Sequence, residues 1–154
     1  MIYGGLRGIG TEAGPCCVGI VDDDREIVAT FKKMFERHGI PVCVLAYDGS
    51  EAVRVFGDLE RKPTVILMDE RMSFMSGTEA TRELVKNDPK LGIIFISADA
   101  NSMDQAFNAG AKVFLKKPTS INVIMDAVKL VRRNCSTNKY YYDGYKGFVA
   151  NTTN

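Results

Sequence analysis

The sequence predicts a doubly wound α/β domain, in which helices cover both faces of a five-stranded parallel sheet. Five short runs of the chain are almost wholly apolar, which is typical of strands buried on both faces. The segments between these runs carry apolar residues three and four positions apart, as one-sided helices do. The two patterns alternate strictly, and such alternation favours right-handed crossovers between parallel strands.

The predicted elements follow one another from residue 16 to residue 134. The expected strands are Cys16 to Val21, Val42 to Ala46, Val65 to Met68, Ile93 to Ile96 and Val113 to Leu115. The apolar positions of the expected helices fall within residues 27–35, 52–59, 80–85, 103–107 and 121–131. Gly39 and Pro41 end the first helix, Gly110 ends the fourth, and Pro118 precedes the fifth.

Five strand-helix units fit the flavodoxin-like strand order 2-1-3-4-5. In this topology the carboxyl ends of strands 1, 3, 4 and 5 surround one crevice beside the point where the strand order reverses, and ligands bind there. We therefore expect the functional residues directly after these four strands.

Two segments flank the predicted domain, which spans residues 16–134. Residues 1–15 form a glycine-rich leader that we expect to be flexible, because ordering glycine costs the most backbone entropy. Residues 135–154 form a tyrosine-rich tail, with Lys139 and Lys146 among its aromatic residues. Its aromatic density favours docking on the domain or on a partner, and a weakly ordered tail is the alternative.

The composition excludes several classes of protein. Of the 154 residues, 45% are hydrophobic and 25% are charged, as in soluble globular domains. A formal net charge of +1 gives no field that would attract nucleic acid or anionic lipid. No run approaches the roughly 18 apolar residues of a membrane helix, and the first residues lack the apolar stretch of a signal peptide. We expect a cytoplasmic protein that binds neither nucleic acid nor membranes directly.

The four cysteines are Cys16, Cys17, Cys43 and Cys135, and none of them forms a C-x-x-C pair. This pattern predicts neither a disulfide framework nor a zinc site. We expect buried, small hydrophobic side chains on strands.

Polar residues follow four of the predicted strands. Asp22 and Asp23 follow the first, Asp69 the third, Ser97 the fourth and Lys117 the fifth. Two carboxylates about 4 Å apart repel each other by roughly 4 kcal/mol at an effective dielectric constant of about 20, so positive charge must lie among them. Lys117 supplies one charge, and a divalent cation with oxygen ligands, preferably Mg²⁺, supplies the rest.

These residues lie in short motifs that resemble the receiver domain of two-component response regulators, over roughly residues 16–134. The motifs are V-D-D at residues 21–23, I-L-M-D-E-R-M at 66–72, Gly77, F-I-S-A at 95–98 and F-L-K-K-P at 114–118. The resemblance implies a phosphoacceptor signalling domain. It also implies that the protein is not an enzyme beyond self-catalysed phosphotransfer and autodephosphorylation.

The resemblance assigns a role to each residue of the predicted crevice. It makes Asp69 the phosphoacceptor, and it places Lys117 and Ser97 on the oxygens of the phosphoryl group. The Mg²⁺ ligands that it implies are Asp22, Asp23, Asp69 and the backbone carbonyl of Arg71. It also implies a cis peptide bond between Lys117 and Pro118.

The resemblance further implies a switch and a set of partners. Ser97 and Phe114 are the switch residues, because drawing Ser97 inward vacates space that the Phe114 ring can enter. The phosphodonor is a sensor histidine kinase or a phosphotransfer protein. A downstream protein would bind the face made by the fourth helix, the fifth strand and the fifth helix, and a homodimer is compatible with the sequence.

Three features of the sequence bear on this interpretation. Ser73 stands where the family often has proline, which should loosen the loop after the phosphoacceptor. Phe114 lacks the hydroxyl of a tyrosine. Arg71 and Asp99 lie two residues after Asp69 and Ser97, so we expect their opposite charges to face each other across the mouth of the pocket.

Two alternatives remain open. The first is a hydrolase of the haloacid-dehalogenase type with Asp22 as its nucleophile, suggested by the D-x-D pattern of residues 22–24, Ser97 and a later lysine. Arg25 and the lack of an acidic motif after Lys117 oppose it, and it leaves Asp69 without a role. The second is a pseudo-receiver, which would keep the fold and bind partners without phosphorylation.

Overall fold

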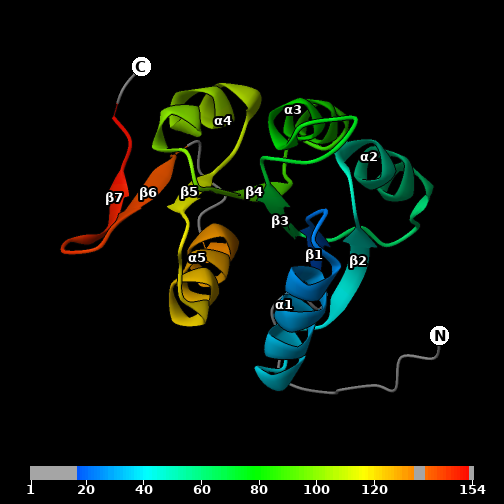
Figure 1. Cartoon of the computed structure of the whole chain (residues 1–154), viewed down its shortest axis with the longest axis horizontal. Coiled ribbons are helices and arrows are strands. Elements are labelled where there is room, and N and C mark those ends of the chain that lie inside the picture. The colour runs from blue at the N-terminus through cyan, green and yellow to red at the C-terminus, as the bar shows by residue number, and fades with distance from the viewer. Residues whose placement is uncertain (1–16, 134–137, 153–154) are drawn as a thin grey trace.

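The computed structural model of the chain describes residues 17–133 and 138–152. The predicted leader, Cys16 and Cys135 lie outside these residues. Five strand-helix units are followed by two further strands (Figure 1). The helices are α1 (Arg25–Arg37), α2 (Gly49–Asp58), α3 (Gly77–Asn87), α4 (Met103–Ala109) and α5 (Ile121–Arg133), with a short 3₁₀ turn η1 (Ala100–Ser102) before α4. The strands are β1 (Val18–Val21), β2 (Val42–Ala46), β3 (Val65–Asp69), β4 (Gly92–Ser97), β5 (Val113–Lys116), β6 (Tyr140–Asp143) and β7 (Gly147–Ala150).

The strands form one sheet in the order β2-β1-β3-β4-β5-β6-β7. The first five are parallel and follow the predicted order 2-1-3-4-5. Helices α1 and α5 cover one face of the sheet, and α2, α3 and α4 cover the other (Figure 1). In the register of the sheet, Asp69 lies beside Ile96 and Ser97 beside Lys116, so the carboxyl ends of β3, β4 and β5 meet at one edge.

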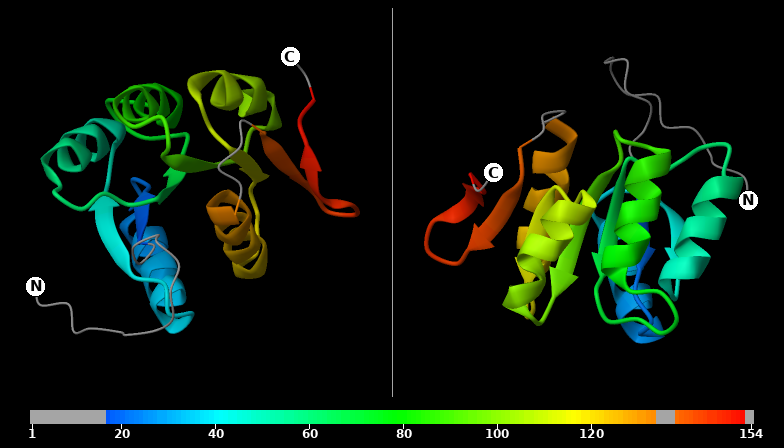
Figure 2. Two further views of the ribbon diagram at one scale, coloured as in Figure 1. Left: turned by 180° about the vertical axis from the view of Figure 1, so that it is seen from behind. Right: turned by 90° about the horizontal axis from the view of Figure 1, so that it is seen from above.

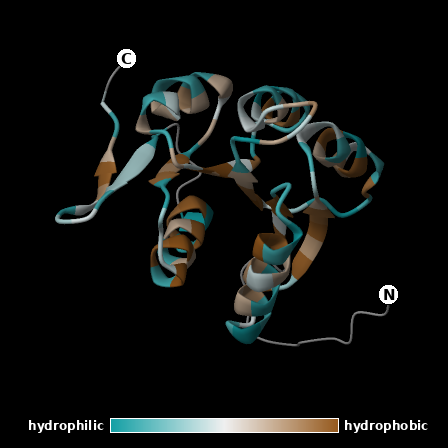
Figure 3. Cartoon of the chain, in the orientation of Figure 1, coloured by the Kyte–Doolittle hydropathy of each residue, from teal (hydrophilic) through white to brown (hydrophobic). Residues whose placement is uncertain are grey.

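The core is divided by the sheet into two apolar layers. One layer packs Phe56 of α2, Leu84 of α3 and Phe107 of α4 against the sheet, and the other packs Phe35 of α1 and Ile124 of α5. Burying each of these side chains contributes about 1.5–3 kcal/mol. The inward helix faces and most strands are accordingly hydrophobic (Figure 3). Among the described helices, none has the length and apolar character needed to cross a membrane.

The prediction of five strands is incomplete, because residues 140–150 of the tail form an antiparallel hairpin, β6–β7, at the end of the sheet (Figure 2). Strand β6 runs parallel to β5 and places Tyr140 beside Val113 and Tyr141 beside Phe114. Tyr141 packs on the layer under α2, α3 and α4, while Tyr140 and Phe148 pack on the layer under α1 and α5. These three aromatic residues of the tail thus dock on the chain's own domain, whereas Tyr142 and Tyr145 are exposed.

Removal of residues 136–154 is expected to lower stability, because the hairpin covers the edge of β5 and partly buries three aromatic side chains. At about 1.5–3 kcal/mol for a fully buried aromatic, the partial burial here predicts a loss of about 2–4 kcal/mol. Urea unfolding of the full and shortened chains measures it. Equal free energies of unfolding for the two chains would show that the docking contributes nothing to stability.

The cysteine prediction is wrong for one pair. Cys17 and Cys43 form a disulfide, with their Cα atoms 5.8 Å apart. Cys17 directly precedes β1, Cys43 lies in β2, and these strands are neighbours with Val18 beside Val42. The sheet register therefore brings together two residues that are 26 positions apart in the chain, a proximity that their spacing did not indicate.

Candidate functional site

Three carboxylates converge at the edge of the sheet where β1 and β3 end. Asp22 follows β1 and is 5% exposed, and Asp69 is the last residue of β3 and is 7% exposed. One oxygen from each of Asp22, Asp23 and Asp69 lies within 4.8 Å of the others. Such a cluster of oxygen ligands suits a hard divalent cation such as Mg²⁺.

Asp24, the third consecutive acid after β1, serves the backbone. Its side chain accepts hydrogen bonds from the backbone N–H groups of Glu26 (2.9 Å) and Ile27 (3.2 Å), so it caps the N-terminus of α1. The Asp24 N–H in turn donates to Asp22 Oδ1 at 2.9 Å. The start of α1 therefore holds the Asp22 carboxylate in place. Because the Asp24 carboxylate caps the helix, it is not free for catalysis, which disfavours the hydrolase predicted from the D-x-D pattern of residues 22–24.

Lys117 supplies positive charge to the cluster. Its Nζ donates to Asp69 Oδ1 at 2.6 Å and lies 3.8 Å from Asp22 Oδ2. The Lys117 N–H donates to the carbonyl of Ser97 at 2.8 Å, which ties the end of β5 to the end of β4. The Lys117–Pro118 peptide bond is cis, as predicted. Lys116, the neighbouring lysine, is exposed.

The structure brings most of the predicted site residues together around one pocket of about 220 Å³. Its lining includes Asp22, Asp23, Asp69, Arg71, Ser97 and Lys117. Ser97 is 2% exposed, and its Oγ accepts a hydrogen bond from the Asp99 N–H at 3.1 Å. The pocket therefore presents acids, a hydroxyl and an ammonium group to one small volume.

Phe114 does not line this pocket. Its ring is 4% exposed and lies under α4, between Phe95 of β4 (ring centroids 6.1 Å apart) and Phe107 of α4 (6.5 Å). The predicted switch residue is thus connected to the site through β4 and α4.

Glu70 is a site residue that the sequence analysis missed. Its Oε2 accepts hydrogen bonds from the Thr78 N–H (2.9 Å) and the Thr78 hydroxyl (3.0 Å), which fastens the start of α3 to the end of β3. Burial, the largest cause, raises the pKa of the Glu70 carboxyl above its usual range. Glu70 directly follows Asp69 in the motif of residues 66–72, and this position was the one sign in the sequence that it could belong to the site.

The connection between the end of β3 and the start of α3 also requires glycine at position 77. A Cβ at this position would lie 2.1 Å from the backbone oxygen of Asp69, which no side chain tolerates. The close approach of α3 to the end of β3 therefore depends on glycine.

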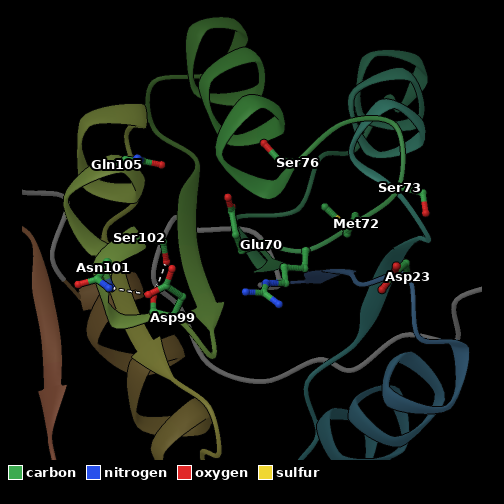
Figure 4. A pocket seen from close by; sticks show the side chains of 10 residues that line it. Asp23, Glu70, Met72, Ser73, Ser76, Asp99, Asn101, Ser102 and Gln105 are labelled. Carbon is green, nitrogen blue, oxygen red and sulfur yellow. Dashed lines mark hydrogen bonds between the residues drawn. The ribbon is translucent and has the colours of Figure 1, made fainter.

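A larger cleft of about 590 Å³ adjoins the pocket and shares Asp23, Glu70 and Arg71 with it. Asp23 and Asp99 lie at opposite sides of this cleft, with Glu70 between them (Figure 4). Arg71 and Asp99 both line it, as expected for the pocket mouth. No ion pair joins these two residues within the described parts of the chain. The Asp99 carboxylate accepts a hydrogen bond from the Asn101 N–H (2.9 Å) and caps η1.

The buried Asp22 carboxylate gives the site a measurable pH dependence. Burial, the largest cause, raises the pKa of Asp22 above 3.8; the Asp24 N–H opposes this shift, and the Asp69 charge adds to it. The folded chain therefore binds the Asp22 proton more tightly than the unfolded chain does. Its stability falls as the pH rises from the ordinary aspartate pKa through the raised one.

Asp22→Asn is therefore expected to be more stable than the wild type at neutral pH, because it removes the buried charge and can keep the bond from Asp24. The advantage should shrink as the pH falls through the raised pKa of Asp22, and it should be smallest below pH 3.8, where Asp22 is protonated in both the folded and the unfolded chain. Urea unfolding in EDTA across this range measures it. Asp48→Asn is the control with the opposite expected sign at neutral pH, because the Ser50 hydroxyl lowers the Asp48 pKa. A wild type more stable than Asp22→Asn at neutral pH would contradict this account.

Comparisons with known proteins agree with this geometry. The family model for the response regulator receiver domain matches residues 18–129. The chemotaxis protein CheY of Thermotoga maritima is 34% identical over 116 residues, which cover 74% of this chain and 95% of that protein. CheY of Bacillus subtilis is 31% identical over 111 residues, covering 71% and 91%. Among solved structures, the CheX–CheY–BeF₃–Mg²⁺ complex from Borrelia burgdorferi matches with a TM-score of 0.72 and 27% identity, over 77% of this chain and 90% of that one.

Proposed function

The chain belongs to the response regulator receiver domain family, and on this premise we propose that Asp69 accepts the phosphoryl group in this chain. The observation that carries the proposal is the contact of Lys117 Nζ with Asp69 at 2.6 Å, inside a cluster that also holds Asp22 and Asp23. We assign the receiver to residues 16–134 and place its signalling role in the cytoplasm.

The proposed reaction is a transfer to a carboxylate. A carboxylate oxygen of Asp69 forms a bond to phosphorus, and the bond between phosphorus and the donor imidazole nitrogen breaks. The protein's task is to position the groups and to neutralise the charge that spreads over the phosphoryl oxygens. The Lys117 ammonium group already lies beside Asp69 and can donate a hydrogen bond to one of the phosphoryl oxygens. The Ser97 hydroxyl can donate to another.

Mg²⁺ fits the donor set of the pocket, which offers three carboxylates within 4.8 Å. Asp22, Asp23, Asp69 and the backbone carbonyl of Arg71 are the groups that we propose to hold it. When bound, the ion would supply the positive charge that Lys117 alone cannot provide. Asp23, which is exposed, keeps this set open to solvent on one side.

The proposed partners reach different parts of the domain. A sensor histidine kinase or a phosphotransfer protein must approach Asp69 through the pocket mouth. The downstream protein would bind the exposed surfaces of α4 and α5, because β6 already covers the edge of β5 between them. The fifth strand was expected to be part of the partner face, and the hairpin limits access to it.

The mass of the intact protein after incubation with Mg²⁺ and acetyl phosphate tests the proposal. We expect one added phosphoryl group per chain, and no addition in EDTA. A hydrolase with Asp22 as nucleophile would instead release phosphate steadily, and Asp22→Asn would abolish the release. A pseudo-receiver would neither gain mass nor release phosphate.

Arg71 and Asp99 are expected to act together on the lifetime of the phosphoryl group. Both line the cleft over the pocket, where a water must approach in line with phosphorus to remove the group. A double-mutant cycle of Arg71→Ala and Asp99→Ala, measured as the dephosphorylation rate, should be non-additive. Changes that add in log rate within error would show that the two side chains act independently.

A further inference from the structure

The β6–β7 hairpin lies outside residues 18–129, which the receiver family model matches. It extends the sheet beyond β5, on the side of the domain where α4 and α5 cover the two faces of the sheet (Figures 1 and 2). This chain therefore carries its own occupant on a sheet edge that would otherwise be free.

Two contacts connect the hairpin and Lys139, the residue before it, to β5 and α4: one reaches the switch residue Phe114 and the other reaches Phe107. In the β5–β6 pairing Tyr141 lies beside Phe114, and both pack in the layer that contains Phe107. Lys139 Nζ donates to the Phe107 carbonyl at 2.6 Å and lies 6.0 Å from the Phe107 ring. The hairpin is thus anchored to both β5 and α4.

The backbone pairing of β6 with β5 is short. Among the described residues the register pairs Val113 with Tyr140 and Phe114 with Tyr141, and the Tyr140 N–H donates to the Lys112 carbonyl at 2.8 Å. Tyr142 and Tyr145, which extend from the outer part of the hairpin, are 36% and 102% exposed. A shift of α4 that displaces the Phe107 carbonyl would therefore break the Lys139 hydrogen bond and leave the hairpin held by its short pairing with β5 and by its apolar packing.

The acidic pocket is also connected to α4, the helix that holds Lys139 through the Phe107 carbonyl. Ser97 lines the pocket, and its Oγ accepts the Asp99 N–H at 3.1 Å. Asp99 caps η1, which leads directly into α4 and hence to Phe107. A group in the pocket that draws the Ser97 hydroxyl towards Asp69 takes it away from Asp99 and loosens the start of this segment.

We propose that the β6–β7 hairpin is a releasable cover of the β5 edge, held in the resting protein and loosened when Asp69 carries a phosphoryl group. The proposal rests on the proposed function, since the phosphoryl group supplies the pull on Ser97. Release of the hairpin exposes the edge of β5, which lies between α4 and α5, to solvent or to a partner. Because coupling is reciprocal, a weaker hairpin anchor also favours the occupied site.

Hydrogen exchange of the full chain, with and without Mg²⁺ and beryllofluoride as the phosphoryl mimic, tests the release. We expect exchange of the amides at residues 140–143 to become at least threefold faster when the mimic is bound, while β1 and β3 stay protected. Unchanged or slower exchange in the hairpin with the site occupied would overturn the proposal. A chain that takes up no phosphoryl group from acetyl phosphate would instead contradict the proposed function.

Lys139→Met tests the reciprocal effect, because it removes the ammonium donor to Phe107 and keeps the length of the side chain. We expect it to bind beryllofluoride three- to tenfold more tightly than the wild type in the presence of Mg²⁺. Lys146→Met is the matched control, since Lys146 is exposed in the turn of the same hairpin. Equal affinities for the two variants would overturn the role of the Lys139 anchor.

Discussion

Asp69→Asn is expected to gain no phosphoryl group under conditions in which the wild type gains one. The amide has nearly the shape of the carboxylate, so the buried end of β3 should keep its packing. It lacks the nucleophilic oxygen anion, and it also removes one of the three carboxylates of the cluster. The variant should therefore lose the reaction and keep the fold.

The measurement is the mass of the intact protein after incubation with Mg²⁺ and acetyl phosphate. Asp58→Asn is a suitable control, because Asp58 is an exposed aspartate at the end of α2, outside the pocket. It should be phosphorylated as the wild type is. Uptake by Asp69→Asn at the wild-type level would mean that the acceptor is another residue.

The positions of the site residues could be predicted because they depend on topology. Parallel strands bring their carboxyl ends to one edge, so Asp22, Asp69, Ser97 and Lys117 had to meet once the five strands were recognised. Side chains alternate along a strand, so only one of the adjacent Lys116 and Lys117 can point into the crevice, and Pro118 directly after Lys117 indicates which one; Lys116 is exposed. These inferences needed only the local pattern of apolar and polar residues.

Other features depend on contacts between distant segments, and the sequence carried little sign of them. The Cys17–Cys43 disulfide follows from the register of β1 and β2. The partner of Glu70 is Thr78, eight residues further along, on the far side of a turn. Strand β6 is a run of three tyrosines, of which Tyr140 and Tyr141 are half-buried because the edge of β5 lies beside them.

The bond between Lys117 and Asp69 makes Lys117→Met the second change with a large expected effect. In the resting site the ammonium lies 2.6 Å from Asp69 and 3.8 Å from Asp22, and both carboxylates are buried. During transfer, negative charge collects on the phosphoryl oxygens, and a positioned cation in such a site contributes about 10²–10³-fold in rate. We therefore expect phosphorylation by acetyl phosphate to slow by about two to three orders of magnitude.

Lys116→Met is the matched control, since it removes the same charge one residue away from an exposed position. Its rate should stay within about twofold of the wild type, because an exposed charge contributes little. A Mg²⁺ titration separates loss of the reaction from loss of the fold. Lys117 contacts Asp22 and Asp69, two of the groups proposed to hold Mg²⁺, so Lys117→Met should bind Mg²⁺ at least as tightly as the wild type. If both methionine variants react at the same rate while Lys117→Met still binds Mg²⁺, the ammonium group does not stabilise the transferring phosphoryl group, and its contact with Asp69 serves only to balance charge in the resting site.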